Sequence, residues 1–258
     1  MKTHLHINCL SSTNTYLKDL VSKHPIDSLQ DFLPPYFAIT ADKQQKGRGQ
    51  QNKSWESEAG KNLLMSLLLY PRVHPSKQFN ISQYISIAIA DFIKEKVNNN
   101  VYIKWPNDIY VGDNKIVGIL IEHFIRGETI NYTIAGIGIN INQTVFSSSL
   151  PNPTSIYLET GQEHNLIDCM KTIIEKIKQT ETLPDTIRTS YYENYLYKKD
   201  VFSDFIIPKI SNIPLSLKIK GVNEIGLLEL VDINNVSYCC AFNEIVYVRD
   251  EQLNNAIF

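Results

Sequence analysis

The order of helical and extended segments constrains the fold of this chain most. Up to about residue 200, β-prone and helical segments mix without the regular strand–helix–strand alternation of a doubly wound parallel sheet. From residue 204 onward only short β-prone segments remain, separated by turn residues such as Asn234 and Asn235. We therefore predict two domains. Residues 1–200 should form an α+β domain, a mixed β-sheet with helices on one face, and residues 201–258 a small barrel-like β-domain.

Hydrophobic periodicity places the individual elements. Residues 62–70 are a continuous apolar run that is long enough to be a central strand, and residues 80–98 have the periodicity of an amphipathic helix. The other strands expected in the first domain cover residues 4–9, 36–41, 101–105, 108–111, 115–125 and 132–139, and the other helices cover residues 15–22, 165–180 and 186–197. The strands expected in the second domain cover residues 215–222, 226–233, 237–242 and 245–249.

Composition excludes several classes of protein. The net charge is −2 and the pI is about 6.3, so there is no electrostatic reason to expect general binding to nucleic acids. No apolar run approaches the roughly 20 residues of a membrane span, and the N-terminus lacks the apolar segment of a signal peptide. The four cysteines form no CxxC pair and favour free thiols, and the scattered histidines give no metal site. We expect a cytoplasmic protein that binds neither DNA nor a membrane.

A polar segment over residues 42–55 holds the first candidate for chemistry. Gly47 and Gly49 flank Arg48, so the backbone can bend closely around an anion while the guanidinium adds contacts to phosphate. The alternative is a flexible surface loop with solvated charge. The segment does not match GxxxxGK[ST], so it is not a P-loop.

A second candidate follows the strand at 101–105, where Pro106 is followed by Asn107 and Asp108. Lys115 lies across the next hairpin from Asp108, so the two side chains can approach each other, and the carboxylate would then orient the ammonium and keep it charged. A purely structural turn and an ordinary hairpin-end lysine are the alternatives. Gly118 weakens the following strand unless something must approach it closely.

Two further segments carry small or polar residues in a pattern. Gly136 and Gly138 alternate on one strand and would open a cavity on one face, and Asn140 continues that face with an amide that can donate and accept, as adenine recognition requires. Close strand packing is the alternative. Residues 11–14, Ser-Ser-Thr-Asn, are good helix caps and need be no more than that.

The order of these motifs is more specific than any one of them. SSTN, then QxxGRG with a later Trp, KWPND, KxxGIL, GIGINxN and a short β-domain together resemble the biotin protein ligases over nearly the whole chain. The resemblance implies a sheet similar to that of class II aminoacyl-tRNA synthetases, followed by an SH3-like β-barrel. It also implies a two-step reaction, in which biotin and ATP, assisted by Mg²⁺, give biotinyl-5′-AMP. The biotinyl group then passes to a lysine of a biotin carboxyl carrier protein domain of a carboxylase.

The resemblance also assigns residues. Those implied to bind biotin are Ser12, Thr13, Asn14, Gln44, Gly47, Arg48, Gly49, Gln50, Lys115, Gly118, Gly136 and Gly138. Those implied to contact the nucleotide are Arg48, Trp55, Asn107, Lys115 and Asn140. Lys115, Arg48 and Asp108 are implied to be catalytic: Lys115 and Arg48 stabilise negative charge, and Asp108 positions Lys115 or the incoming amine. No direct metal ligand is assigned.

Two features depart from the common pattern of the family. Gln50 stands where bacterial members commonly have a second loop arginine, so we hypothesise weaker retention of the adenylate, with Lys53 as a possible source of the missing charge. The SSTN motif begins at residue 11, so we expect no N-terminal winged-helix domain and no repressor function. The resemblance leaves both a monomer and a homodimer open.

Three other functions remain open for this sequence. A lipoate–protein ligase or octanoyltransferase would share the fold, but KWPND with GRG favours biotin. A noncatalytic binding module is encouraged by Gln50 and discouraged by Arg48 and Lys115. A nucleic-acid-binding protein that uses its small β-barrel is disfavoured by the slightly acidic net charge.

Overall fold

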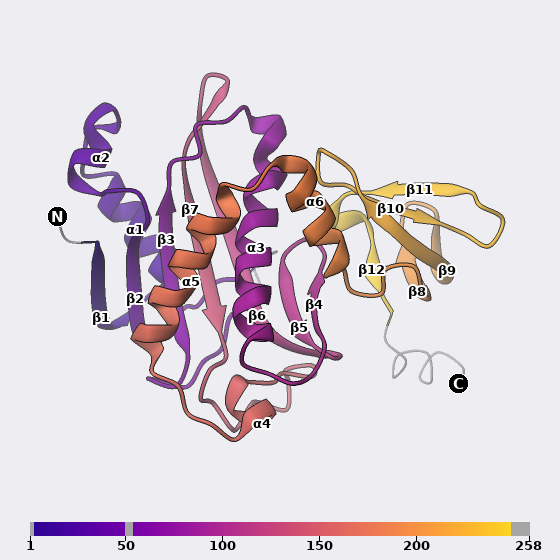
Figure 1. Cartoon of the computed structure of the whole chain (residues 1–258), viewed down its shortest axis with the longest axis horizontal. Helices are drawn as coiled ribbons and strands as arrows, with labels where there is room; N and C mark the ends of the chain where they lie inside the picture. Colours follow the sequence, from indigo (N-terminus) through magenta and orange to yellow (C-terminus); the bar gives the residue numbers. More distant parts are fainter. Residues whose placement is uncertain (1–2, 50–53, 249–258) are drawn as a thin grey trace.

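Figure 1 shows a computed structural model of the chain, which describes residues 3–49 and 54–248. A seven-stranded sheet forms its centre, in the strand order β1-β2-β3-β7-β6-β5-β4. Its strands are β1 (His4–Leu10), β2 (Phe37–Gln44), β3 (Leu63–Leu69), β4 (Val101–Lys104), β5 (Asp108–Val111), β6 (Asn114–Arg126) and β7 (Thr129–Ile139). β1 pairs with β2 in parallel and every other pair is antiparallel, which confirms the predicted mixed sheet.

Helices cover both faces of this sheet to different extents. The long helices α3 (Gln78–Lys94) and α5 (Leu166–Glu181) lie together on one face, as predicted, and pack on Met65 and Leu67 of β3 (Figure 1). The short helices α1 (Thr13–Val21) and α2 (Leu29–Phe32) pack on the opposite face, where Leu17 contacts a separate cluster that includes Leu68. All seven residues of β3 are buried because both of its faces are covered.

The remaining elements of the first unit are α4 (Ile156–Thr160) and α6 (Asp185–Asn194). Asn165 caps α5, since its side-chain oxygen accepts hydrogen bonds from the N–H groups of Ile167 and Asp168. In the part of the chain that the structure describes, no helix is both long enough and apolar enough to cross a bilayer.

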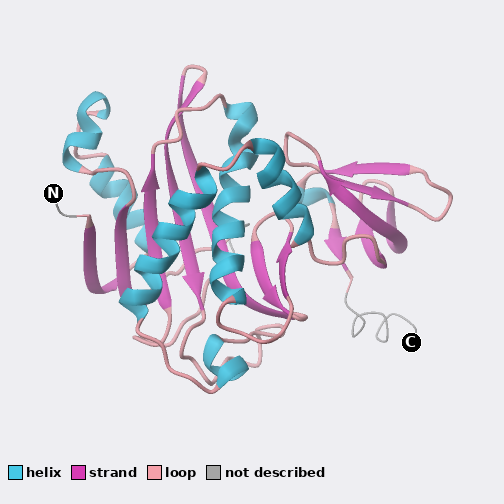
Figure 2. Cartoon of the chain, viewed as in Figure 1, coloured by secondary structure: helices cyan, strands magenta, loops and turns pink. Residues whose placement is uncertain are grey.

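The C-terminal strands form a second, five-stranded antiparallel sheet in the order β11-β10-β9-β8-β12. Its strands are β8 (Phe202–Ile207), β9 (Ser211–Val222), β10 (Leu228–Val231), β11 (Ser237–Cys240) and β12 (Val246–Tyr247). Figure 2 shows these strands as a separate group beyond α6. The small β-unit was expected, but β8 was not, because Ser203 and Asp204 interrupt its apolar alternation.

Candidate active site

Three glycines form a cradle on the face of the sheet that carries α1. Gly118 of β6 is directly opposite Gly138 of β7, and Gly136 lies two residues earlier on β7. A Cβ atom at Gly136 would lie 2.3 Å from Asn14 Oδ1, and one at Gly118 or Gly138 would lie 2.7 or 2.6 Å from Trp55. Other side chains therefore approach the bare backbone at all three positions, and Asn14 and Trp55 occupy the space where the spacing of Gly136 and Gly138 predicted an open cavity.

The start of α1 forms a polar wall at one end of the cradle. Ser12, Thr13 and Asn14 are all buried. Ser12 is the N-cap, but its side chain makes no capping bond. Instead, Gln44 of β2 accepts hydrogen bonds through Oε1 from the Thr13 N–H at 2.8 Å and from the Thr13 hydroxyl at 3.2 Å. The predicted pair of Thr13 and Gln44 is thus brought together, and it satisfies a free amide of the first helical turn.

Asn14 is fixed from both ends of its amide. The Ser66 hydroxyl donates to Asn14 Oδ1 at 2.5 Å, and Asn14 Nδ2 donates to Glu122 Oε2 at 2.9 Å and to the Leu120 carbonyl at 3.3 Å. Together these partners define which way the amide points. The sequence analysis assigned no role to Ser66 or Glu122. The available signal for Ser66 was a polar residue inside an otherwise apolar strand, and for Glu122 it was a carboxylate directly after the apolar residues 119–121.

The predicted anion-binding segment returns on itself above this wall. The Trp55 N–H donates to the Gly47 carbonyl at 3.1 Å, and Arg48 forms a β-bridge with Ser54. A Cβ atom at Gly47 would lie 2.3 Å from the Trp55 carbonyl oxygen, so this close crossing requires glycine. Gly49 is half-buried, and Gln50 and Lys53, the residues of the predicted change in loop charge, lie outside the described residues.

Arg48 lies beside a carboxylate in this state. Its Nη1 atom is 3.4 Å from Glu122 Oε1, the same carboxylate that accepts from Asn14. Both side chains are partly exposed. A polar chain therefore runs from Ser66 through Asn14 and Glu122 to Arg48, and it links the buried wall of the cradle to the predicted anion-binding segment.

Trp55 fills part of the space that the glycines leave. Its indole ring lies against Gly118 and Gly138, and the Lys115 ammonium is 5.9 Å from the ring centroid. The indole Nε1 is buried and has no hydrogen-bond partner among residues 3–49 and 54–248. Trp55, which we predicted near the nucleotide, is thus placed over the two glycines predicted to admit biotin.

Lys115 and Asp108 form the charged pair of the site. Lys115 Nζ is 2.5 Å from Asp108 Oδ2, and each side chain is about 30% exposed. The expected approach of these residues across the β5–β6 hairpin is confirmed. The backbone of Lys115 is held by neighbouring chain, because its N–H donates to the Asn152 carbonyl at 2.8 Å and its carbonyl accepts from the Thr154 N–H at 3.0 Å.

The two asparagines predicted near adenine are both buried. Asn140 follows β7 and donates through Nδ2 to the Thr154 carbonyl at 2.9 Å, while its Oδ1 has no partner in the described part of the chain. The Asn140 N–H also donates to the Ile116 carbonyl at 3.0 Å. Asn140 therefore lies next to the backbone of the Lys115 strand with one amide oxygen still available as an acceptor.

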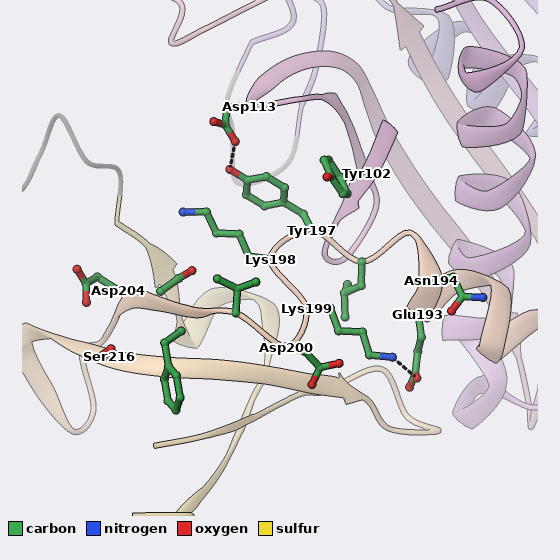
Figure 3. Close-up of a pocket in the computed structure, with 14 residues that line it drawn as sticks. Tyr102, Asp113, Glu193, Asn194, Tyr197, Lys198, Lys199, Asp200, Asp204 and Ser216 are labelled. Carbon is green, nitrogen blue, oxygen red and sulfur yellow. Dashed lines mark hydrogen bonds and ion pairs between the residues drawn. The ribbon is translucent and has the colours of Figure 1, made fainter. Parts of the chain in front are cut away.

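The structure also contains a separate cleft of about 830 Å³ where α6 meets the C-terminal sheet. Figure 3 shows Lys199 paired with Glu193, at 2.8 Å, and the Tyr197 hydroxyl bonded to Asp113, at 2.6 Å. None of the described residues assigned to biotin or nucleotide lines this cleft. Within residues 3–49 and 54–248, no group of three or more His, Cys, Asp or Glu side chains could hold a metal ion.

Comparison with known proteins settles the family. Residues 6–140, more than half of the 258 residues, match the sequence model of the "Biotin/lipoate A/B protein ligase family". The chain belongs to this family. The matched residues include the α1 wall, the glycine cradle and the Asp108–Lys115 pair, so the geometry described above falls within the family domain.

Two relatives and one solved structure show how far the similarity extends. The bifunctional ligase/repressor BirA of Bacillus subtilis is 34% identical over 139 residues, which are 54% of this chain and 40% of that protein. The biotin–[acetyl-CoA-carboxylase] ligase of Paracoccus denitrificans is 28% identical over 129 residues, 48% of this chain and 53% of the other. The Aquifex aeolicus biotin protein ligase in complex with biotin and ATP has a TM-score of 0.76 at 20% identity and covers 97% of this chain and 100% of that one. The last similarity shows a shared fold.

Proposed function

We propose that this protein is an ATP-dependent biotin protein ligase. It would form biotinyl-5′-AMP from biotin and ATP and transfer the biotinyl group to a lysine of a biotin carboxyl carrier protein domain. The observation that carries the proposal is the Asp108–Lys115 pair beside a glycine cradle that ends in a polar wall. The name of the Paracoccus denitrificans relative, a biotin–[acetyl-CoA-carboxylase] ligase, supports biotin as the acyl group.

The polar wall suits the ureido end of biotin. Thr13 and Gln44 present hydroxyl and amide groups to the cradle, and the hydrogen bonds between them hold both side chains in place. Preorganised donors and acceptors cost little ordering when a ligand binds. Biotin would occupy the surface over Gly118 and Gly138 once the Trp55 ring has moved off it, and the indole would then form an apolar wall beside the bicycle.

In the first step, a carboxylate oxygen of biotin attacks the α-phosphorus of ATP, the bond from that phosphorus to the bridging oxygen breaks, and pyrophosphate leaves. Two anions must meet, so positive charge is needed where they react. Lys115 would supply it at the α-phosphate, and its bond to Asp108 fixes the direction of the ammonium. Arg48 would exchange Glu122 for the acyl-phosphate as the segment around it closes.

In the second step, the carrier lysine attacks the acyl carbon, the bond from that carbon to the phosphate oxygen breaks, and AMP leaves. The amine loses a proton as the amide forms, and Asp108, the carboxylate beside Lys115, would orient the amine and accept that proton. Until then the mixed anhydride must be kept from water, a role suited to Trp55 and the segment before it.

The nucleotide would lie towards Asn107 and Asn140. The Asn140 amide oxygen is a buried acceptor without a partner among the described residues, which fits the exocyclic amine of adenine. Mg²⁺ would enter bound to the phosphates, where it supplies charge neutralisation. A metal carried by the nucleotide needs no cluster of protein ligands, which fits a site whose charged groups are Lys115, Arg48, Asp108 and Glu122.

The proposal is tested by pyrophosphate release from MgATP with biotin, lipoate or octanoate as the acyl donor. We expect release with biotin alone, and its loss in Lys115→Ala. The matched control is Lys46→Ala. Lys46 is an exposed lysine of the polar segment 42–55, and the structure gives it no substrate role. Release with lipoate or octanoate but not biotin would overturn the substrate, and no release with any of the three from a folded protein would overturn the enzyme.

The partner is tested separately. Incubation with a biotin carboxyl carrier protein domain should give a mass increase equal to one biotinyl group, and replacing the acceptor lysine by arginine should abolish it. The proposal does not include DNA binding, because a net charge of −2 offers no electrostatic support for it. A homodimer is a further hypothesis, which sedimentation at several protein concentrations would test.

A further inference from the structure

Two tyrosine rings contact the ammonium of Lys104, and a third packs against both of them. Lys104 Nζ is 4.6 Å from the centroid of the Tyr247 ring and 5.2 Å from that of Tyr110. Tyr197 stacks on Tyr110 with ring centroids 5.6 Å apart, and its centroid lies 6.4 Å from that of Tyr247, so Tyr197 bridges the two rings that contact the lysine. We call Tyr110, Tyr197 and Tyr247 the tyrosine cluster.

The cluster joins the two sheets. Lys104 ends β4 and Tyr110 lies on β5, both in the seven-stranded sheet, whereas Tyr247 lies on β12 of the C-terminal sheet. Tyr197 follows α6, and its hydroxyl bonds to Asp113 in the β5–β6 turn (Figure 3). The C-terminal sheet thus contacts the hairpin that carries Asp108 and Lys115.

Lys104 lies next to the charged pair of the site. In the β4–β5 register Lys104 is directly opposite Asp108, so both side chains project from the same face with Cβ atoms about 5 Å apart. Asp108 in turn bonds to Lys115. The Lys104 ammonium, which Tyr247 contacts, therefore belongs to the residue that neighbours Asp108 across the strands, and Asp108 is bonded to Lys115, the proposed ligand of the α-phosphate.

The surroundings of Lys104 strengthen its contact with the rings. The Tyr247 hydroxyl is buried with no hydrogen-bond partner in the described chain, and burial raises the pKa of Tyr247 well above its usual range. A cation over an aromatic face is held more strongly where water is excluded. Tyr110 is also buried. The cluster is therefore suited to fixing the direction of the Lys104 side chain.

We propose that Tyr247 is a positioning residue for the ligase reaction, because its ring holds the Lys104 ammonium beside Asp108 and Lys115. This rests on the proposed function and makes the C-terminal sheet part of the reacting site through one contact. With Lys104 held, the carboxylate of Asp108 is flanked by two ammonium groups, which gives this end of the site a net positive charge towards a triphosphate. The ureido end of the cradle lies at Asn14, away from the cluster, so biotin affinity should not depend on Tyr247.

A second contact between the sheets makes the proposal testable. The Trp105 indole N–H donates to the Gly226 carbonyl at 3.1 Å, and the Trp105 ring packs edge-on against Phe242 at 5.9 Å. This contact does not involve Lys104. The C-terminal sheet therefore keeps an anchor when Tyr247 is changed, and Phe242→Leu is a matched control that loosens the same junction without touching the lysine.

The experiment measures kcat and KM for MgATP and for biotin by pyrophosphate release. We expect Tyr247→Leu and Lys104→Met each to lower kcat about tenfold, the double variant to be no slower than either, and KM for biotin to stay within about twofold. Tyr247→Phe keeps the ring and should match the wild type, as should Phe242→Leu. Thermal unfolding of each variant checks that it folds.

Additive losses in the double variant, an equal loss in Tyr247→Phe, or an equal loss in Phe242→Leu would overturn the positioning role. A readout without turnover separates this result from failure of the proposed function. The rate of Lys104 acetylation by acetic anhydride, followed by mass spectrometry, should rise several-fold in Tyr247→Leu and not in Phe242→Leu. A wild type that releases no pyrophosphate with any acyl donor would refute the ligase, and unchanged Lys104 labelling would refute the contact.

Discussion

Substituting Gly138 by alanine tests the glycine cradle directly. A Cβ atom at this position would lie 2.6 Å from both Cε2 and Nε1 of Trp55. Carbon atoms in contact are about 3.5–4.0 Å apart, so the indole ring or strand β7 must move by about 1 Å. Neither moves easily, since Gly138 is paired with Gly118 and Leu64 on its two sides and the ring also lies against Gly118.

The expected change in the free energy of unfolding is the difference between two opposing contributions. Overpacking of this kind costs about 1–3 kcal/mol. Alanine in place of glycine within a strand recovers about 0.5–1 kcal/mol, because the unfolded chain loses less freedom. We therefore expect Gly138→Ala to lower the free energy of unfolding by about 1–2 kcal/mol. In a Trp55→Ala background the clash is gone, and the same change should be neutral or slightly stabilising.

Gly138→Ala, Trp55→Ala and the double variant form a double-mutant cycle with the wild type. Urea unfolding followed by circular dichroism measures the free energy of unfolding of each protein without relying on tryptophan fluorescence. The coupling between Gly138 and Trp55 should be about 1–3 kcal/mol. Gly136→Ala is the matched control on the same strand, since its Cβ atom would meet Asn14 and not Trp55, so its cost should be the same in both backgrounds. The reasoning fails if Gly138→Ala costs as much without Trp55 as with it.

Three further predictions concern single side chains. Asp108→Asn removes the charge that orients Lys115 and should lower kcat for pyrophosphate release by about 10²–10³; an unchanged kcat would exclude that role. Gln44→Ala leaves the Thr13 N–H and hydroxyl without their acceptor. It should raise KM for biotin about tenfold and leave kcat unchanged, which steady-state kinetics with varied biotin would measure. Burial lowers the pKa of His123, so its contribution to stability is full above about pH 6.5 and is lost as the pH falls below it. The decline between pH 7.5 and 5.5, at most about 1.4 kcal/mol per unit, should be smaller in His123→Gln.

Much of the fold was predictable because local patterns determine it. The apolar run of β3 placed that strand within one residue of its observed ends, and the periodicity of α3 placed the helix within two residues of its start and four of its end. The helix at α1 was predicted, but the face of the sheet on which it packs was not. β3 indicates this face, because a strand that is apolar at every position must be covered on both faces.

The site was predictable where its partners are close in sequence. Asp108 and Lys115 are joined by one hairpin, and strand pairing across the turn brings them together. Asn14 and its partners Ser66 and Glu122 come from three separate elements. Their contact depends on how β3, β7 and β6 pair and on where α1 crosses them, which no local pattern specifies.

The contacts of Lys104 and Trp105 explain why these two residues precede the turn in the segment KWPND, residues 104–108. A turn alone needs only Pro106 and the polar residues after it, and Asp108 then serves the charged pair. Lys104 and Trp105 instead reach the C-terminal sheet through Tyr247 and the Gly226 carbonyl. Five consecutive residues thus connect that sheet to the proposed reacting groups. Substitutions in the C-terminal unit that displace Lys104 should therefore lower turnover, and those that leave Lys104 in place, such as Phe242→Leu, should not.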